Sequence, residues 1–275
     1  MIKLLHLVMA LPLALIISCS SSQKKLNKAE ILYNMGTNYL IKKQYSQALK
    51  SFLDALEMAP DDPRIHNNLG MAYYFKKDKK RAKEHIIKSI EIKPQDSDAR
   101  NNLASIYLEE NKLTLAEEQY KKILKDLTYL SQFRTYYNLG LVELRRGNNN
   151  KAKNYFTKAT EEDINYCPAH YQLGLLNYNK DNYKVALQNF KDGSMGRCYN
   201  LPESQYYYAL TLMKLQKNEQ ALDKFEKIAS RFQGQEIAKK ARRLMNNLKR
   251  KISNPVYKDN LSVTKRKIDK PERIL

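Results

Sequence analysis

The stretch "YYNLGLVELRRGNNNKAKNYFTKA", residues 136–159, decides the fold because the spacing of its glycine, alanine and phenylalanine residues recurs along the chain. Gly140 is followed after twelve residues by Ala152, and then by Phe156 and Ala159. The same intervals recur in three other places: Gly36 with Ala48, Phe52 and Ala55; Gly70 with Ala82 and Ile86; and Gly174 with Ala186 and Phe190. A spacing that recurs in phase indicates an internal repeat.

The repeat is about 34 residues long, and six units follow one another nearly in phase. They begin at Ala29, Pro63, Ser97, Phe133, Cys167 and Pro202. Gly36 and Ala48 are small, as expected where two helices cross closely, and Pro60 is expected to end the second helix. The pattern resembles the tetratricopeptide repeat of two antiparallel helices. That resemblance implies an all-α, right-handed superhelical solenoid of about six repeats over residues 29–234.

The chain after the sixth repeat changes character twice. Residues 235–252 carry apolar side chains at helical spacing, with a strongly basic opposite face. A solenoid needs a terminal element with a polar outer side, so we predict a C-terminal capping helix here. Residues 253–275 are charged, contain two prolines and lack periodicity, which predicts a flexible basic tail.

The N-terminus has the pattern of an export signal. Lys3 precedes an apolar run of 14 residues, which is shorter than the roughly 20 residues that span a bilayer. Residues 16–19, "IISC", resemble a bacterial lipobox, which implies a signal peptide over residues 1–18. The resemblance further implies palmitate-type lipidation of Cys19, with residues 19–28 as lipidated anchor and tether. An ordinary secretory signal with an incidental cysteine is the alternative.

The predicted location follows from the same resemblance, and the partner class follows from charge. Ser20 after the cysteine implies the periplasmic face of the outer membrane. The formal charge of +20 favours an anionic partner. The basic runs at 76–83 and 239–251 have little aromatic interleaving, which argues against nucleic acid. Lipid headgroups, acidic envelope polymers or an acidic protein remain.

No residue pattern typical of catalysis is present. The four histidines show no paired His/Cys spacing for a metal, and His66 and His170 occupy a packing position of their repeats. The chain also lacks a glycine-rich phosphate loop and a nucleophile elbow. We therefore expect neither an enzyme nor a bound cofactor or metal.

Cys167 and Cys198 are the two cysteines that follow Cys19. They occupy the first and the thirty-second positions of repeat five. Antiparallel helices bring the start of the first beside the end of the second, within the roughly 4.4–6.8 Å between Cα atoms that a disulfide requires. A disulfide is predicted, and two buried free thiols are the alternative.

The first helix of each repeat is expected to line a concave groove through its fifth, ninth and twelfth positions. The residues predicted to bind a peptide there are Tyr33, Asn67, Met71, Tyr74, Asn101, Tyr137, Leu141, Tyr171, Leu175, Tyr178, Tyr206 and Leu210. From repeat four onward these positions are aromatic and aliphatic, which suits an extended or helical apolar peptide. The alternative is that the tyrosines only pack between neighbouring repeats.

A lipobox, a short tether and six such repeats together resemble the PilF/PilW-type lipoproteins of type IV pilus biogenesis. The segment 126–159, which begins with the insertion before repeat four, carries the more specific part of this likeness. The resemblance implies a pilotin-like protein that supports assembly or localisation of an outer-membrane secretin. A scaffold subunit of another envelope machine, for outer-membrane protein assembly or peptidoglycan synthesis, is the alternative function.

Overall fold

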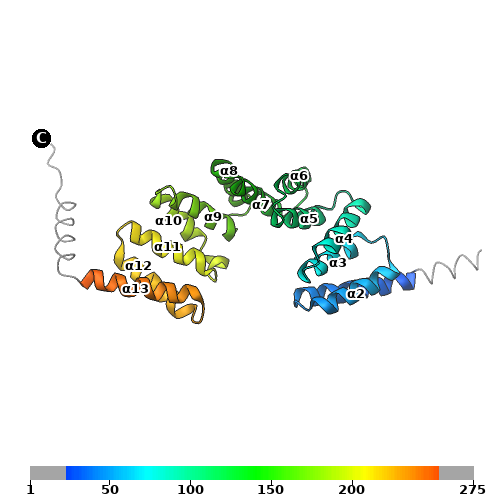
Figure 1. Cartoon of the computed structure of the whole chain (residues 1–275), viewed down its shortest axis with the longest axis horizontal. Helices are drawn as coiled ribbons and strands as arrows, with labels where there is room; N and C mark the ends of the chain where they lie inside the picture. The colour runs from blue at the N-terminus through cyan, green and yellow to red at the C-terminus, as the bar shows by residue number, and fades with distance from the viewer. Residues whose placement is uncertain (1–22, 254–275) are drawn as a thin grey trace, which may run out of the picture. The chain divides into compact units, whose positions relative to one another are not determined.

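The computed structural model describes residues 23–253, which form helices and contain no strand. A first helix covers residues 23–41. The helices that follow are α2 (Tyr45–Met58), α3 (Pro63–Phe75), α4 (Lys79–Ile92), α5 (Ser97–Glu109), α6 (Leu113–Ile123), α7 (Gln132–Arg145), α8 (Asn149–Glu162), α9 (Cys167–Tyr178), α10 (Tyr183–Asp192), the 3-10 turn η1 (Gly196–Cys198), α11 (Pro202–Lys214), α12 (Asn218–Arg231) and α13 (Glu236–Ser253) (Figure 1).

Each predicted repeat is a pair of neighbouring helices. The two helices pack against each other within each of the pairs α3–α4, α5–α6, α7–α8, α9–α10 and α11–α12. The helix of residues 23–41 packs on α2 in the same way. The all-α repeat architecture is therefore confirmed. Pro60 follows the end of α2 at Met58, as its missing N–H predicts.

The small residues of the repeat lie where the two helices cross, as predicted. A Cβ added at Gly36 would lie 2.6 Å from Cε1 of Phe52, and one added at Gly70 would lie 2.6 Å from Cγ1 of Ile86. Phe52 and Ile86 are fully buried. Because glycine has no Cβ, the large side chain of the second helix can fill the space where the two helices cross.

The turn between the two helices holds one residue with positive φ in every repeat. These residues are Lys43, Lys77, Asn111, Gly147, Asp181 and Gln216, with φ between 58° and 79°. All stand at position fifteen of their repeats. The Lys43 N–H bonds the Leu40 carbonyl and the Gln44 N–H bonds the Tyr39 carbonyl, the pattern of a Schellman helix end.

The chain divides into two compact units between Ser131 and Gln132. Unit 1 contains repeats one to three, and unit 2 contains repeats four to six with α13. The division falls at the insertion noticed in the sequence, in the connection between α6 and α7. Leu127 and Leu130 in this connection are 88% and 95% exposed, so they belong to neither core.

The ends of the described chain differ from the prediction. Residues 23–28, predicted as tether, continue the first repeat helix toward the N-terminus. They include good helix formers such as Lys24 and Leu26, and the Gln23 amide donates to Asn27 one turn later. Residues 23–28 are exposed along this helix, and residues 19–22, the rest of the predicted tether, lie outside the described residues. The predicted signal peptide, residues 1–18, and Cys19 also lie outside the described residues.

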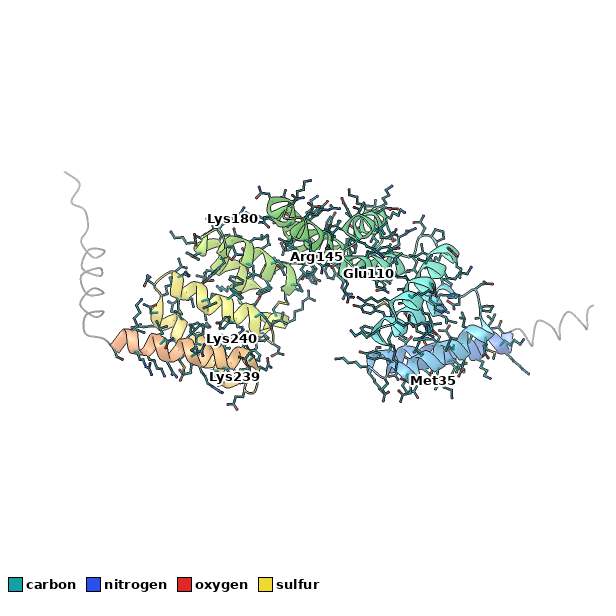
Figure 2. All side chains as sticks on the ribbon, in the orientation of Figure 1. Met35, Glu110, Arg145, Lys180, Lys239 and Lys240 are labelled. Atoms are coloured by element: carbon teal, nitrogen blue, oxygen red, sulfur yellow. A yellow bond between two sulfur atoms is a disulfide. The ribbon has the colours of Figure 1, made fainter. Side chains whose placement is uncertain are left out.

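The helix predicted at residues 235–252 is α13, Glu236–Ser253. It packs on α12 and buries Ala238, Ala241 and Leu248. Lys239 and Lys240 are exposed on it, as the basic outer face predicts (Figure 2). Residues 254–275, the rest of the predicted tail, lie outside the described part.

Candidate functional site

The predicted groove residues of unit 1 use their polar atoms to join successive repeats. Tyr33 Oη accepts a hydrogen bond from Asn68 Nδ2 at 3.3 Å. Asn67 Oδ1 accepts one from Asn102 Nδ2 at 2.9 Å. Tyr74, Met71 and Asn101 are half-buried beside them. This face of unit 1 is therefore polar and largely occupied by its own hydrogen bonds.

Tyr74 shows the same use of a polar atom. Its hydroxyl donates to Glu109 Oε2 at 2.7 Å, from the first helix of repeat two to that of repeat three. This hydrogen bond, and secondly burial, raise the pKa of Tyr74. Lys79 pairs with the other oxygen of Glu109 at 2.8 Å. The hydroxyl therefore has a partner inside the repeat array before any ligand arrives.

The predicted residues of unit 2 form a different surface, which is aromatic. The Tyr137 ring lies 5.6 Å from Phe156 and 5.4 Å from Tyr166, as measured between centroids. The Tyr171 ring lies 6.1 Å from Phe190. Leu141, Leu175 and Leu210 are half-buried on the same helices, α7, α9 and α11. The rings pack against the second helices, as the packing alternative requires, yet each keeps an exposed side.

Tyr207 is the centre of this surface and was missed in the sequence. Its ring lies 5.8 Å from Tyr171, 5.9 Å from Tyr178 and 6.0 Å from Tyr206. Tyr207 stands at position six of its repeat, where the first four repeats carry asparagine. This departure from asparagine could have indicated Tyr207 from the sequence, because position-six side chains such as Asn68 and Asn102 contact the first helix of the preceding repeat.

These hydroxyls are uncharged near neutral pH, and burial raises their pKa further. Burial is the main cause that raises the pKa of Tyr137, and with Tyr207 and Glu203 nearby it raises the pKa of Tyr171 to about 12. Burial also raises the pKa of Tyr178 and Tyr206. The face of unit 2 therefore offers uncharged rings with hydroxyl tips. Such a surface can hold apolar side chains and hydrogen-bond a backbone.

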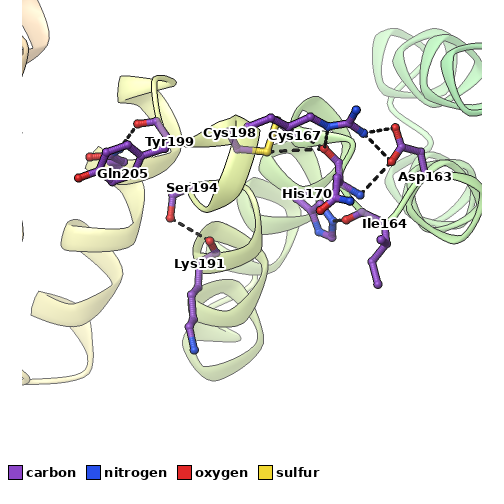
Figure 3. Close-up of a disulfide and its surroundings, with 11 residues drawn as sticks. Asp163, Ile164, Cys167, His170, Lys191, Ser194, Cys198, Tyr199 and Gln205 are labelled. Atoms are coloured by element: carbon purple, nitrogen blue, oxygen red, sulfur yellow. Dashed lines mark hydrogen bonds and ion pairs between the residues drawn. A yellow bond between two sulfur atoms is a disulfide. The ribbon is translucent and has the colours of Figure 1, made fainter.

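Cys167 and Cys198 are joined in the structure, with an S–S distance of 2.03 Å and 5.5 Å between Cα atoms (Figure 3). Cys167 begins α9, but Cys198 lies in η1 rather than at the end of the second helix, because α10 ends at Asp192. Arg197 forms an ion pair with Asp163 and donates to the Asn165 carbonyl at 3.1 Å. The segment before α11 is thus attached to the start of α9 twice.

The buried histidines are structural. Nε2 of His66 lies 2.9 Å from the Pro60 carbonyl, and Nε2 of His170 lies 2.7 Å from the Ile164 carbonyl. Among residues 23–253, no group of three histidine, cysteine, aspartate or glutamate side chains is arranged to hold a metal. Within the same range, no helix has both the length and the apolar character needed to span a bilayer.

Comparison with known proteins identifies the repeat. Models described as tetratricopeptide repeat match residues 36–76, 63–96, 97–125, 133–163 and 203–234. No curated protein matches the chain.

Solved structures match over most of the chain. PilF from Pseudomonas aeruginosa matches with a TM-score of 0.69 at 20% identity, over 79% of this chain and 97% of that chain. PilW, described as a widely conserved type IV pilus biogenesis factor, matches with a TM-score of 0.67 at 20% identity, over 77% and 97%. A tetratricopeptide repeat protein from Parabacteroides merdae matches at 18% identity and 0.56, over 74% and 80%. At these identities the likeness shows the fold alone.

Proposed function

Since the chain belongs to the tetratricopeptide repeat proteins, whose repeats mediate protein–protein interaction, we propose that it is a membrane-anchored scaffold that holds a protein segment on unit 2. The observation that carries the proposal is the partly exposed aromatic face of α9 and α11, with Tyr171, Tyr178 and Tyr206 around Tyr207. Its hydroxyls are neutral and its leucines are half-buried. An extended or helical apolar segment fits that chemistry.

We further propose that the scaffold is pilotin-like and acts on an outer-membrane secretin. Two features support this: the fold likeness to PilF and PilW, and the lipobox-like residues before Cys19. A lipid on Cys19 would hold the repeats at the periplasmic face of the outer membrane, since several acyl chains anchor stably. Binding a secretin segment there raises its local concentration and favours ring assembly without any covalent step.

The binding face is tested with a triple variant, Tyr137→Ala, Tyr171→Ala and Tyr178→Ala, in the full-length chain. We expect loss of secretin capture in a pull-down from detergent-solubilised envelopes, with the helical circular dichroism retained. Tyr155→Ala is the matched control, because Tyr155 is a half-buried tyrosine on α8, the second helix of its repeat. Loss of helicity in the triple variant would return these tyrosines to a packing role.

The pilus role is tested by deleting the gene. We expect fewer secretin multimers and surface pili while secretin monomers persist. Normal secretin rings in the deletion strain would contradict the pilotin role and leave the scaffold of another envelope machine.

The anchor is tested by Cys19→Ser, which should yield a soluble or unprocessed form. A variant that is processed normally and still fractionates with the outer membrane would refute lipidation.

A further inference from the structure

Unit 2 contains a basic pocket whose lining includes none of the tyrosines of the aromatic face, Tyr137, Tyr171, Tyr178, Tyr206 and Tyr207. It has a volume of about 430 Å³ and lies between α10, α11, α12 and the segment after α10. The side chains that matter for its chemistry are Lys191, Lys224, Lys227, Arg231, Tyr199 and Tyr208. No carboxylate lines it. The volume lies in the range of roughly 300–1,000 Å³ that is usual for ligand sites.

The cations around this pocket are mostly without counter-charges. Lys227 pairs with Asp223 at 2.9 Å. Lys191, Lys224 and Arg231 have no carboxylate partner anywhere in residues 23–253. Like charges that share a pocket repel one another, and an anion that enters is attracted to all of them.

Arg231 is held in a fixed orientation. Its guanidinium carbon lies 3.5 Å from the centroid of the Tyr199 ring, and Nη2 donates to Asn200 Oδ1 at 2.9 Å. The N–H groups of a guanidinium lie in its own plane, and those that Asn200 does not use can bind an oxyanion in bidentate fashion. Because the side chain is already ordered, binding loses less rotamer entropy.

The wall that carries Tyr199 is also formed in advance. Tyr199 follows Cys198, which the disulfide joins to the start of α9 (Figure 3). Gln205 on α11 donates to the Tyr199 carbonyl, and the ion pair of Arg197 with Asp163 holds the same segment. The backbone that carries Tyr199 is therefore attached both to the start of α9 and to α11.

We propose that this pocket binds an acidic segment of a protein partner, at a site separate from the aromatic first-helix face. Lys224, Lys227 and Arg231 all lie on α12, a second helix. Carboxylates of the segment meet the cations, and an apolar neighbour lies against the exposed parts of Tyr199 and Met195. A planar membrane surface does not enter a concave pocket, and free phosphate has no apolar group for the rings.

The test uses a fluorescein-labelled nonapeptide of three glutamate–glutamate–leucine triplets and the full-length chain in neutral detergent. Fluorescence anisotropy should show binding that weakens as salt is added, because exposed charges are screened. The pair Lys224→Gln and Arg231→Gln should bind roughly 100-fold more weakly, since each lost charge-assisted bond costs about tenfold. The pair Lys249→Gln and Arg250→Gln, exposed on α13, removes the same charge and should bind like wild type.

Three outcomes would overturn the proposal. One is equal loss of binding in the α13 control pair, which would mean non-specific attraction to a basic chain. Another is undiminished binding of the same peptide with glutamine in place of glutamate. The third is binding of phosphatidylglycerol vesicles, but not of the peptide, that depends on Lys224 and Arg231. The triple tyrosine variant should keep its affinity for the acidic peptide, which separates this site from the aromatic face.

Discussion

Reduction of the Cys167–Cys198 bond should destabilise unit 2 by several kcal/mol. The two cysteines are 31 residues apart in the chain. In the chain-entropy model, a closed loop of that length lowers the entropy of the unfolded state by about 12 cal/mol/K, which is about 3.7 kcal/mol at 25 °C. This is a large share of the roughly 5–15 kcal/mol by which domains are stable.

The folded state should survive the reduction. The Arg197–Asp163 ion pair still holds the segment to the start of α9, and both cysteines are nearly buried in the native packing. The effect therefore acts mainly on the unfolded chain, as a change of urea midpoint with little change in the native spectrum. A wild-type comparison with and without reductant also avoids the packing lost in a cysteine substitution.

The measurement is urea unfolding followed by circular dichroism, with and without a phosphine reductant, converted through the slope m. The variant Cys167→Ala with Cys198→Ala keeps Cys19 and should not respond to the reductant. Faster amide exchange should be confined to α9, α10, α11 and their neighbours, since a repeat contacts only adjacent repeats. A decrease in the free energy of unfolding below about 1 kcal/mol would refute the argument, because the reduced loop would then gain little conformational freedom in the unfolded state.

Three further predictions concern packing, turn and charge. Gly140→Ala should lower unfolding free energy by about 1–3 kcal/mol in urea titrations, because the new Cβ meets the Phe156 ring; a gain from helix propensity would contradict this. Gly147→Ala has open space but a φ of 79°, so we expect a loss of about 1 kcal/mol from backbone strain alone, and no loss would argue against that conformation. Burial first, and then His66, lower the pKa of His85 from 6.5 in the folded state. The unfolded state therefore binds the proton more readily, and the free energy of unfolding should fall as the pH drops below 6.5. Thermal melts between pH 7 and 5 measure this slope, which His85→Gln should flatten.

The pair His66 and His85 has a defined hydrogen-bond arrangement. His66 Nε2 faces the Pro60 carbonyl and must carry a proton, so its Nδ1 is the acceptor for His85 Nδ1 at 3.1 Å. A second proton on His85 would enter at Nε2 and leave this hydrogen bond in place, so the cost of charging His85 comes from burial and from the neighbouring His66. An unchanged slope in His85→Gln would contradict the assignment of this pH dependence to His85.

The repeat phase, the helix pairs and their crossing residues were predictable from the sequence. Gly36 lies against Phe52, and Phe52 shares a core cluster with Ala48, so the spacing of these residues within one repeat reflects their packing directly. Position fifteen was not predictable in this way, because lysine, asparagine, aspartate, glutamine and glycine all occupy it. Its left-handed conformation is imposed by the helix end and the packing of the pair, not by residue type.

The sequence by itself determined which face of each helix is buried and which positions of the first helix of each repeat are partly exposed. Both recur with the period of about 34 residues. Only the tertiary structure decided that Tyr207 joins the tyrosines of neighbouring repeats, that Cys198 lies in η1, and that three helices enclose a basic pocket. These features bring together residues from different helices and from the segment after α10, which has no period. Their proximity comes from packing between repeats, and no spacing within a repeat encodes it.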